Sequence, residues 1–289
     1  MRFILIIFSV LSIFLVSFSR PVIVSSIKPI SDIVKAVGGD KVEAHYVIPP
    51  QASVHFYEYK ISDIKLIYEA DLFLYIGVGE PNLEKITRTK AKGEVIKLIN
   101  LKDLNLIYKF EFEHNHSNEE NHKNPHPAIW LDPINAKIIA KHILSKLRDL
   151  DPENMYYYQT NFEKFSKEVD TVLKYGTNKF STLRNRYFIS YHYTWPYFTK
   201  RFGLIYLDVI ELGHGREPTA KHILNIIKQI NRFKIKAIFA SVQFYNKKYT
   251  DLIIRSTNVK VVLLDPFGID KTYIQMIKYN IDKIYDNLE

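Results

Sequence analysis

The sequence of 289 residues contains no cysteine. A disulfide is therefore impossible, and so is a lipid attached through a cysteine thiol. The sequence also has no His-Glu-x-x-His motif, which in many zinc hydrolases places two metal ligands and a general base on one helix. These absences exclude a disulfide scaffold and argue against a secreted zinc hydrolase, which needs three ligands, an open fourth position and a nearby base.

Acidic residues are fewer than basic ones: the sequence has 31 Asp and Glu against 40 Lys and Arg, which gives a formal net charge of +9. The positive residues look scattered along the chain, without a basic stripe interleaved with aromatics and without a known reader motif. We therefore expect no nucleic-acid partner, whereas a weak attraction to an anionic membrane surface stays open. Hydrophobic residues make up 47%, enough to fill two cores and too many for a disordered chain.

The one long apolar run, residues 3–16, follows Arg2 and precedes Ser17-Phe18-Ser19. A short apolar run with these flanks is typical of a secretory signal peptide, so we predict one over residues 1–19, cleaved near Ser19. The alternative is a membrane anchor, but the run falls short of the ~20 residues needed to span a bilayer. Without a cysteine for a lipid, the mature chain is expected free in the periplasm of a bacterium with two membranes.

Residues 20–150 alternate short β-rich runs with segments of helix length. The expected strands are 21–25, 44–48, 72–76 and 95–97, and the expected helices are 30–37, 62–69 and 81–89. This alternation is the pattern of parallel strands joined by helical crossovers. It predicts an N-terminal α/β lobe with a mostly parallel sheet flanked by helices.

Residues 185–289 repeat this alternation. The expected strands are 187–190, 204–209, 237–241 and 260–264, and the expected helices are 194–201, 219–232 and 247–256. The sequence therefore predicts a second, similar α/β lobe after the first.

Between the lobes, residues 151–184 have the pattern of one long helix. Apolar residues recur every three or four positions, at Met155, Tyr158, Phe162, Phe165, Val169 and Val172. Asp151 suits the N-cap and Pro152 the first helical position. A helix reaching Leu183 would be roughly 48 Å long at ~1.5 Å per residue, enough to join both lobes. The alternative is an ordinary core helix that ends at Gly176.

Residues 111–127 contain four histidines and four glutamates and almost nothing apolar. We expect a mobile polar loop. Its histidines His114, His116 and His122 offer a weak metal-gathering function as an alternative, because a flexible donor set loses chain entropy when it closes on an ion.

Four residues stand where apolar runs break: His55, His126, His192 and Asp265. Each of these histidines alone would be more typical of a hydrogen-bonded surface or core residue. Their shared placement favours a joint site, because ligands bind at the carboxyl ends of strands in open α/β sheets. Imidazole and carboxylate donors suit Zn²⁺, and four protein ligands close a tetrahedron. The pattern predicts a protein that carries or stores metal, with two donors from each lobe.

Several short motifs occur in a fixed order along the mature chain. They are Ser-Ser-Ile-Lys-Pro at 25–29, the loop 49–55, Glu-Ala-Asp-Leu at 69–72 with Gly77, the histidine-rich loop, residues 127–133, Tyr-His at 191–192, Tyr-Phe at 197–198, Phe-Gly-Leu at 202–204, Glu-Pro-Thr-Ala at 217–220, Phe-Ala at 239–240 with Gln243, and Leu-Asp-Pro-Phe-Gly at 264–268. Together they resemble the metal-binding substrate-binding proteins of bacterial ABC importers, of the zinc and manganese type (cluster A-I).

The resemblance implies a monomeric binding protein, not an enzyme, that hands its ion to a membrane permease. It implies His55, His126, His192 and Asp265 as ligands. Manganese members typically place a glutamate at position 192, so a histidine there favours Zn²⁺, with Mn²⁺ or Fe²⁺ as alternative cargo. A metal-dependent adhesion protein is a further alternative.

The chain also departs from the family pattern. Ser241 and Val242 stand where glutamate and proline are common, and Val54 stands where some zinc members have a glutamate before the first ligand. If such a glutamate supplies a donor in those members, Asp265 must fill that role here.

Overall fold

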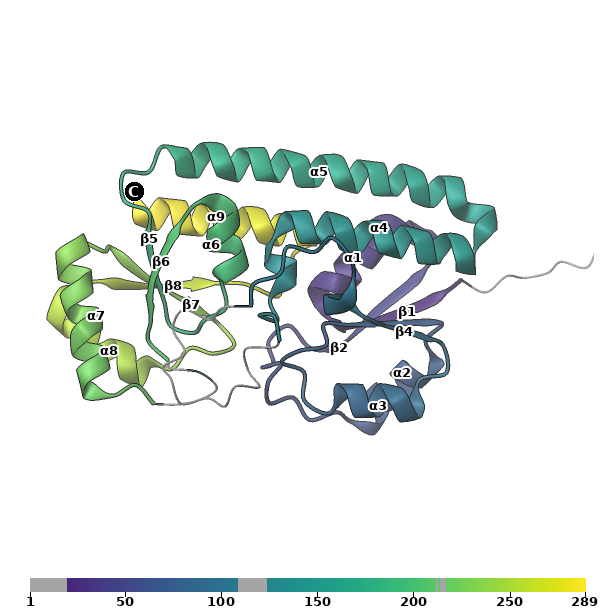
Figure 1. Cartoon of the computed structure of the whole chain (residues 1–289), viewed down its shortest axis with the longest axis horizontal. Coiled ribbons are helices and arrows are strands. Elements are labelled where there is room, and N and C mark those ends of the chain that lie inside the picture. Colours follow the sequence, from purple (N-terminus) through teal and green to yellow (C-terminus); the bar gives the residue numbers. More distant parts are fainter. Residues whose placement is uncertain (1–19, 109–123, 212, 214–216) are drawn as a thin grey trace, which may run out of the picture.

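The computed structural model describes residues 20–108, 124–211, 213 and 217–289. Within them the chain forms two four-stranded parallel sheets flanked by helices and bridged by one long helix, as the sequence predicted (Figure 1). The predicted signal peptide and most of the histidine-rich loop lie outside the described residues. None of the described helices is long and apolar enough to cross a membrane.

The N-terminal sheet has the strand order β2-β1-β3-β4, and every pair is parallel. Its strands are β1 Val22–Ile27, β2 Glu43–Ile48, β3 Leu72–Tyr75 and β4 Glu94–Lys97, and its helices are α1 Lys28–Gly38, α2 Ile61–Glu69, α3 Leu83–Lys90 and α4 Pro133–Leu150. Helices α2 and α3 lie together on one side of the lobe, and α1 and α4 lie together toward the long helix (Figure 1). Short 3-10 turns cover Gly39–Lys41, Leu98–Asn100 and Ile129–Leu131.

The C-terminal sheet repeats this order as β6-β5-β7-β8, again all parallel. Its strands are β5 Tyr187–Ser190, β6 Ile205–Val209, β7 Ala237–Ser241 and β8 Lys260–Leu264, and its helices are α6 Pro196–Phe202, α7 Ala220–Phe233, α8 Lys247–Thr257 and α9 Tyr273–Leu288. Alternate side chains enter different cores: Phe188 and Phe239 stack in the main core, whereas Ile189 and Ile238 pack in the core beneath α7 and α8. Both faces of the central strands β5 and β7 are covered, which is why these two strands are nearly continuous apolar runs.

Helix α5 runs from Met155 to Ser181, and its 27 residues span about 40 Å. The expectation that Asp151 caps it is wrong, because Pro152 opens a separate 3-10 turn that ends at Asn154. The Asp151 carboxylate instead accepts hydrogen bonds from the side chains of Asn154 and Tyr158.

The helix also continues past Gly176, where the alternative reading ended it. A Cβ at this position would lie 2.5 Å from a ring carbon of Phe202 and 2.8 Å from Ile281 Cδ1. Glycine is used here because it lets α6 and α9 pack closely on α5, not because the helix breaks.

The two lobes share one continuous hydrophobic core and several polar bridges. Arg201 of α6 binds the buried Asp132 carboxylate through two hydrogen bonds of 2.7 Å, and Asp132 also caps α4. Trp130 donates to the Pro266 carbonyl at 2.7 Å, and Tyr273 donates to the Trp130 carbonyl at 2.8 Å. Helix α9, which was not among the helices expected from the sequence, packs against α5 and helps fix the lobes to each other.

Candidate metal site

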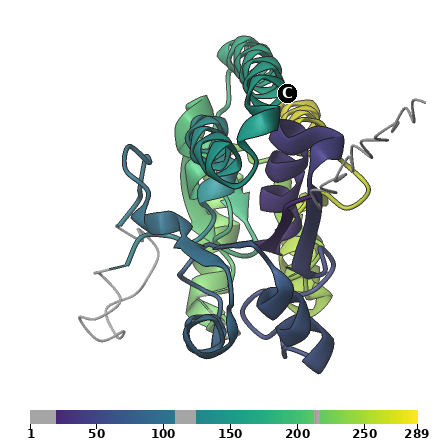
Figure 2. The same ribbon diagram turned by 90° about the vertical axis from the view of Figure 1, so that its right-hand side faces the viewer.

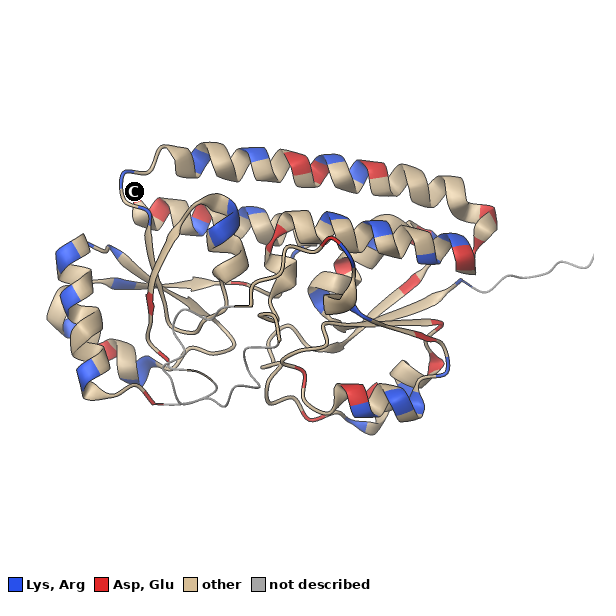
Figure 3. Cartoon of the chain, in the orientation of Figure 1, with Lys and Arg blue, Asp and Glu red and all other residues tan. Residues whose placement is uncertain are grey.

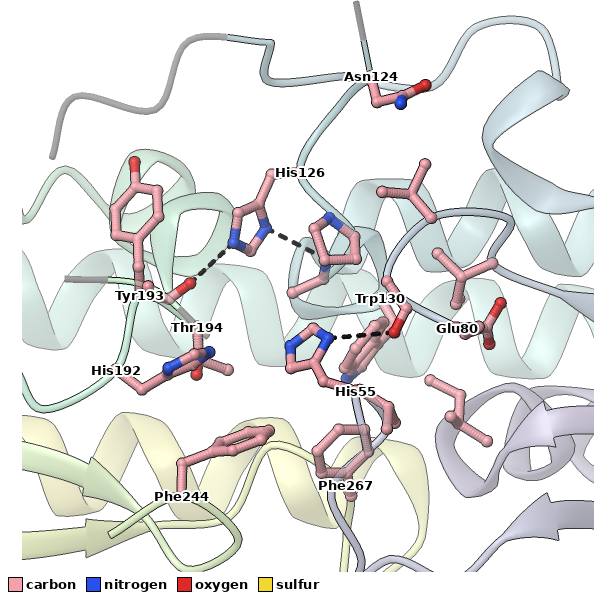
Figure 4. A pocket seen from close by; sticks show the side chains of 18 of the residues that line it. His55, Glu80, Asn124, His126, Trp130, His192, Tyr193, Thr194, Phe244 and Phe267 are labelled. Atoms are coloured by element: carbon pink, nitrogen blue, oxygen red, sulfur yellow. Dashed lines mark hydrogen bonds between the residues drawn. The ribbon is translucent and has the colours of Figure 1, made fainter. Parts of the chain in front are cut away.

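The three predicted histidine ligands line one cavity between the lobes, with a volume of about 280 Å³ (Figure 4). His55 lies in the loop after β2, His126 just before the 3-10 turn that leads to α4, and His192 two residues after β5. The placement of His55 and His192 follows the rule that sites form at the carboxyl ends of parallel strands.

His55 is held by a backbone group. Its Nδ1 donates to the Gly79 carbonyl at 3.1 Å, and this tautomer leaves the lone pair on Nε2. Gly79 has φ +77°, and a Cβ there would lie 3.2 Å from His55 Cε1, so a glycine suits this close approach. The ring centroids of His55 and His192 are 5.8 Å apart. Two imidazoles that share a tetrahedral ion have centroids about 5 Å apart, so a small shift would let this pair bind one ion.

His192 is held by a carboxylate. Its Nδ1 lies 2.8 Å from Oε2 of Glu211, and both side chains are largely buried. The ring stacks on Phe244 with centroids 4.5 Å apart, and the Ser190 hydroxyl donates to the His192 carbonyl at 2.7 Å. A carboxylate that accepts the Nδ1 proton orients the ring and makes Nε2 a stronger donor to a metal.

His126 has hydrogen bonds at both ring nitrogens. Its Nε2 donates to the Tyr193 carbonyl of the other lobe at 2.8 Å, and the Ala128 amide donates to its Nδ1 at 3.2 Å. The Tyr197 hydroxyl donates to the His126 carbonyl at 3.0 Å and so fixes its backbone. An ion can bind this histidine only in exchange for one of its ring hydrogen bonds.

Asp265 directly follows β8, as predicted, but it is not among the residues that line the cavity, although its neighbour Phe267 is. Its Oδ1 accepts from the amides of Phe267 (3.2 Å) and Gly268 (2.8 Å), and its Oδ2 accepts from the Lys271 ammonium at 3.2 Å. The structure therefore brings three of the four predicted ligands together and holds the fourth in its own turn.

Two carboxyl groups at the cavity were missed in the sequence. Glu211 follows β6 by two residues, so the strand-end rule that pointed to His192 could have found it. Glu80 lies three residues after Gly77, and nothing in its local sequence marks it. Its Oε2 accepts from the Gly77 amide at 2.9 Å, its Oε1 is buried without a hydrogen-bond partner among the described residues, and burial raises the pKa of Glu80 to about 7.

Across the part of the chain that the structure describes, no three His, Asp or Glu side chains are arranged to hold one ion as they stand. The three histidine rings instead lie apart around the cavity, and each ring is oriented by a hydrogen bond to another residue. His126 and Asp265 would have to exchange hydrogen bonds before either could contact a cation in the cavity.

Known proteins resemble the chain over nearly its whole length. The model of the family described as zinc-uptake complex component A, periplasmic, matches residues 23–287. The manganese ABC transporter substrate-binding lipoprotein PsaA of Streptococcus pneumoniae is 26% identical over 274 residues, which cover 90% of this chain and 86% of PsaA.

Solved structures agree with this result. A crystal structure of ZnuA has 26% identity and a TM-score of 0.81, and the match covers 94% of this chain and all of that one. The laminin-binding protein Lmb of Streptococcus agalactiae, described as a bifunctional protein with adhesin and metal transporting activity, has 27% identity and a TM-score of 0.77, with 93% of this chain and 100% of Lmb covered.

Proposed function

The chain belongs to the zinc-uptake complex component A family, the metal-binding components of ABC importers, and we propose that it captures Zn²⁺ in the periplasm and delivers it to a membrane permease. The observation that carries this proposal is the convergence of His55, His126 and His192 on one cavity between the lobes. Three imidazoles form a donor set that suits zinc better than manganese, which prefers oxygen-rich sites.

Capture would proceed by exchange of hydrogen bonds for metal bonds. His55 and His192 donate their Nδ1 protons to Gly79 and Glu211, so each would bind the ion through Nε2. His126 would give up its bond to the Tyr193 carbonyl. Asp265 is proposed as the fourth donor, and its carboxylate would have to leave Lys271 to reach the ion. The lost bonds lower the net affinity, which favours later release.

Native mass spectrometry tests the cargo. The exported protein is offered equimolar Zn²⁺, Mn²⁺ and Fe²⁺, and we expect one bound zinc. The variant His192→Glu should shift occupancy toward manganese, whereas His142→Gln, on α4 away from the cavity, should not. Unchanged zinc retention after alanine replacement of all four proposed ligands would contradict the site.

The pH dependence of binding gives a second test. A histidine must be unprotonated to donate to a metal, so zinc affinity should fall steeply below pH ~6.5, the ordinary histidine pKa. Isothermal titration at a series of pH values measures this. An affinity independent of pH would exclude a site built on three imidazoles.

Similarity to two known proteins supports two alternative functions. The similarity to PsaA supports manganese as an alternative cargo, and the mass spectrometry experiment decides between the ions. The similarity to Lmb supports a metal-dependent adhesion function. If the metal were only structural, the metal-free protein would unfold, whereas a carrier stays folded when empty. Thermal melts with and without a chelator distinguish these outcomes.

A further inference from the structure

Positive charge is concentrated in the C-terminal lobe. Residues 20–150 contain 18 Lys and Arg against 17 Asp and Glu, whereas residues 185–289 contain 16 against 9. Within residues 220–260, nine basic residues stand against Asp251 alone, and all nine are exposed. The expectation of a scattered excess is therefore wrong for this lobe, whose outer helices carry much of the charge (Figure 3).

Helices α7 and α8 lie side by side and cover the same face of the C-terminal sheet. Ile223, Ile226 and Ile230 of α7 and Ile253 of α8 are buried against that sheet. The exposed side of the two helices, here called the basic face, consists of Lys221, Leu224, Lys228 and Arg232 on α7 and Lys248, Leu252 and Arg255 on α8. Because these residues are three or four positions apart, they form one stripe on each helix.

The charges of the basic face are mostly without counter-ions. Lys248 pairs with Glu217 at 3.1 Å, and the other four basic residues form no ion pair within the described part of the chain. Lysines of the N-terminal lobe, by contrast, are often paired, as in Lys65 with Glu69 and Lys146 with Glu94.

Each helix also exposes one leucine between its charges. Leu224 is 57% exposed and Leu252 is 55% exposed. Each follows a lysine by three or four residues and precedes another basic residue by three or four. The basic face therefore combines unneutralised positive charge with isolated apolar side chains.

We propose that the basic face docks on a bilayer surface that contains anionic phospholipid. Lysine and arginine are attracted to anionic head groups, and single leucines can enter the boundary between head groups and acyl chains. An acidic protein surface would match the charge, but it would need a shaped pocket for each leucine, whereas a fluid lipid layer accommodates them without one.

The proposal also fits a difference from a relative. PsaA is by name a lipoprotein, whereas the 289 residues here contain no cysteine that could carry a lipid. Weak binding to the bilayer would keep this protein near a membrane permease by reversible attraction. Such attraction does not depend on which metal the cavity binds.

Co-sedimentation with vesicles tests the proposal. The exported protein, with its N-terminus determined by mass spectrometry, is mixed with vesicles of phosphatidylcholine alone or with phosphatidylglycerol. We expect binding to the mixed vesicles only, weakened by salt. Replacing Lys221, Lys228, Arg232 and Arg255 by glutamine should lower the partition coefficient by about tenfold or more. The pair Leu224→Ser and Leu252→Ser should lower it by a smaller factor.

A matched control removes the same charge elsewhere. Replacement of Lys41, Lys85, Lys90 and Lys92, all exposed on the N-terminal lobe, by glutamine should leave most of the binding intact. Equal loss in both fourfold variants, undiminished binding of the basic-face variant, equal binding to neutral vesicles, or no binding of the parent to mixed vesicles at low salt would each overturn the proposal. Zinc occupancy of both variants, measured separately, shows that they are folded.

Discussion

The two lobes have the same strand order, with every pair of strands parallel, yet they hold their histidines by different means. In the view of Figure 2, α5 (teal) and α9 (yellow) lie at the top, on one side of both lobes. In the N-terminal lobe His55 donates to a backbone carbonyl, that of Gly79. In the C-terminal lobe His192 is paired with the carboxylate of Glu211. A backbone carbonyl is neutral and no side-chain substitution removes it, whereas a carboxylate is charged and replaceable. The repeated fold thus supplies one histidine fixed by geometry and one whose donor strength depends on a side chain.

The two lobes also differ in the surroundings of a buried carboxyl group. Glu80, in the N-terminal lobe, has its pKa raised to about 7 because burial disfavours the ionised form. Asp265, in the C-terminal lobe, is ion-paired with Lys271. Burial therefore disfavours the ionised form of Glu80 at the cavity, whereas Asp265 lies away from the cavity lining with a cationic partner. Substitutions in both lobes test this contrast.

The largest effect is expected from removing a donor in either lobe. His55→Ala and His192→Ala should each weaken zinc binding by about 100-fold or more, because each removes one metal bond from a small donor set. Competition titration with a zinc chelator measures the affinity, with His142→Gln as the control. A loss confined to one of the two variants would show that the lobes do not share the ion.

The next effect concerns stability. Glu80 has a folded-state pKa of about 7 against an ordinary value of 4.5, so its favourable contribution is full below pH 4.5 and is lost as pH rises to about 7. Glu80→Gln keeps the acceptor for the Gly77 amide and carries no charge.

The free energy of unfolding of the variant should therefore exceed that of the parent by roughly 3 kcal/mol near pH 8, with almost no gain near pH 4.5. Urea unfolding at both pH values measures this, with the exposed Glu58→Gln as the control. An equal change at both pH values would show that the carboxyl does not titrate in this range.

Glu211 should matter less for binding than the histidines. Glu211→Ala should weaken zinc affinity by about 10- to 100-fold, the usual cost of losing a partner of a metal-binding histidine. Glu211→Gln keeps an acceptor for the Nδ1 proton but removes the charge, so an intermediate loss is expected. The exposed Glu217→Gln is the matched control. If Gln and Ala behave alike, the charge rather than the hydrogen bond is what His192 needs.

The smallest effect is expected at Lys271. Lys271→Met releases the Asp265 carboxylate from its ion pair, so zinc affinity should rise by a few-fold if Asp265 is the fourth donor. Lys278→Met, on the exposed side of α9, is the control. An affinity that stays the same in both Lys271→Met and Asp265→Asn would place Asp265 outside the coordination shell.

Much of the fold was predictable because most strands, such as β3 and β7, contain short apolar runs close to polar residues. The predicted strands agree with the observed ones to within two residues at each end, and α7 and α8 begin within one residue of their expected starts. The N-terminus of α5 was misjudged because Asp151 and Pro152 fit a cap in sequence but form a 3-10 turn. Helix α9 was not predicted, although its sequence is amphipathic, because it follows the last candidate ligand and contains none of the family motifs.

For the candidate site, the sequence predicted where the histidines lie relative to the strands but not which groups their rings contact. The carboxyl ends of parallel strands meet at one edge of each sheet, so the sequence by itself determined that His55 and His192 would lie at such edges. The tertiary structure alone decided the partners of His55 Nδ1 and His126 Nε2, because those partners are distant in sequence: Gly79 lies 24 residues from His55, and Tyr193 lies 67 residues from His126. Periodicity fixes which face a side chain occupies, but only packing of the two lobes fixes its neighbours. Asp265 follows its strand as predicted, but contacts within its own turn, with Lys271 and the Gly268 amide, hold its carboxylate.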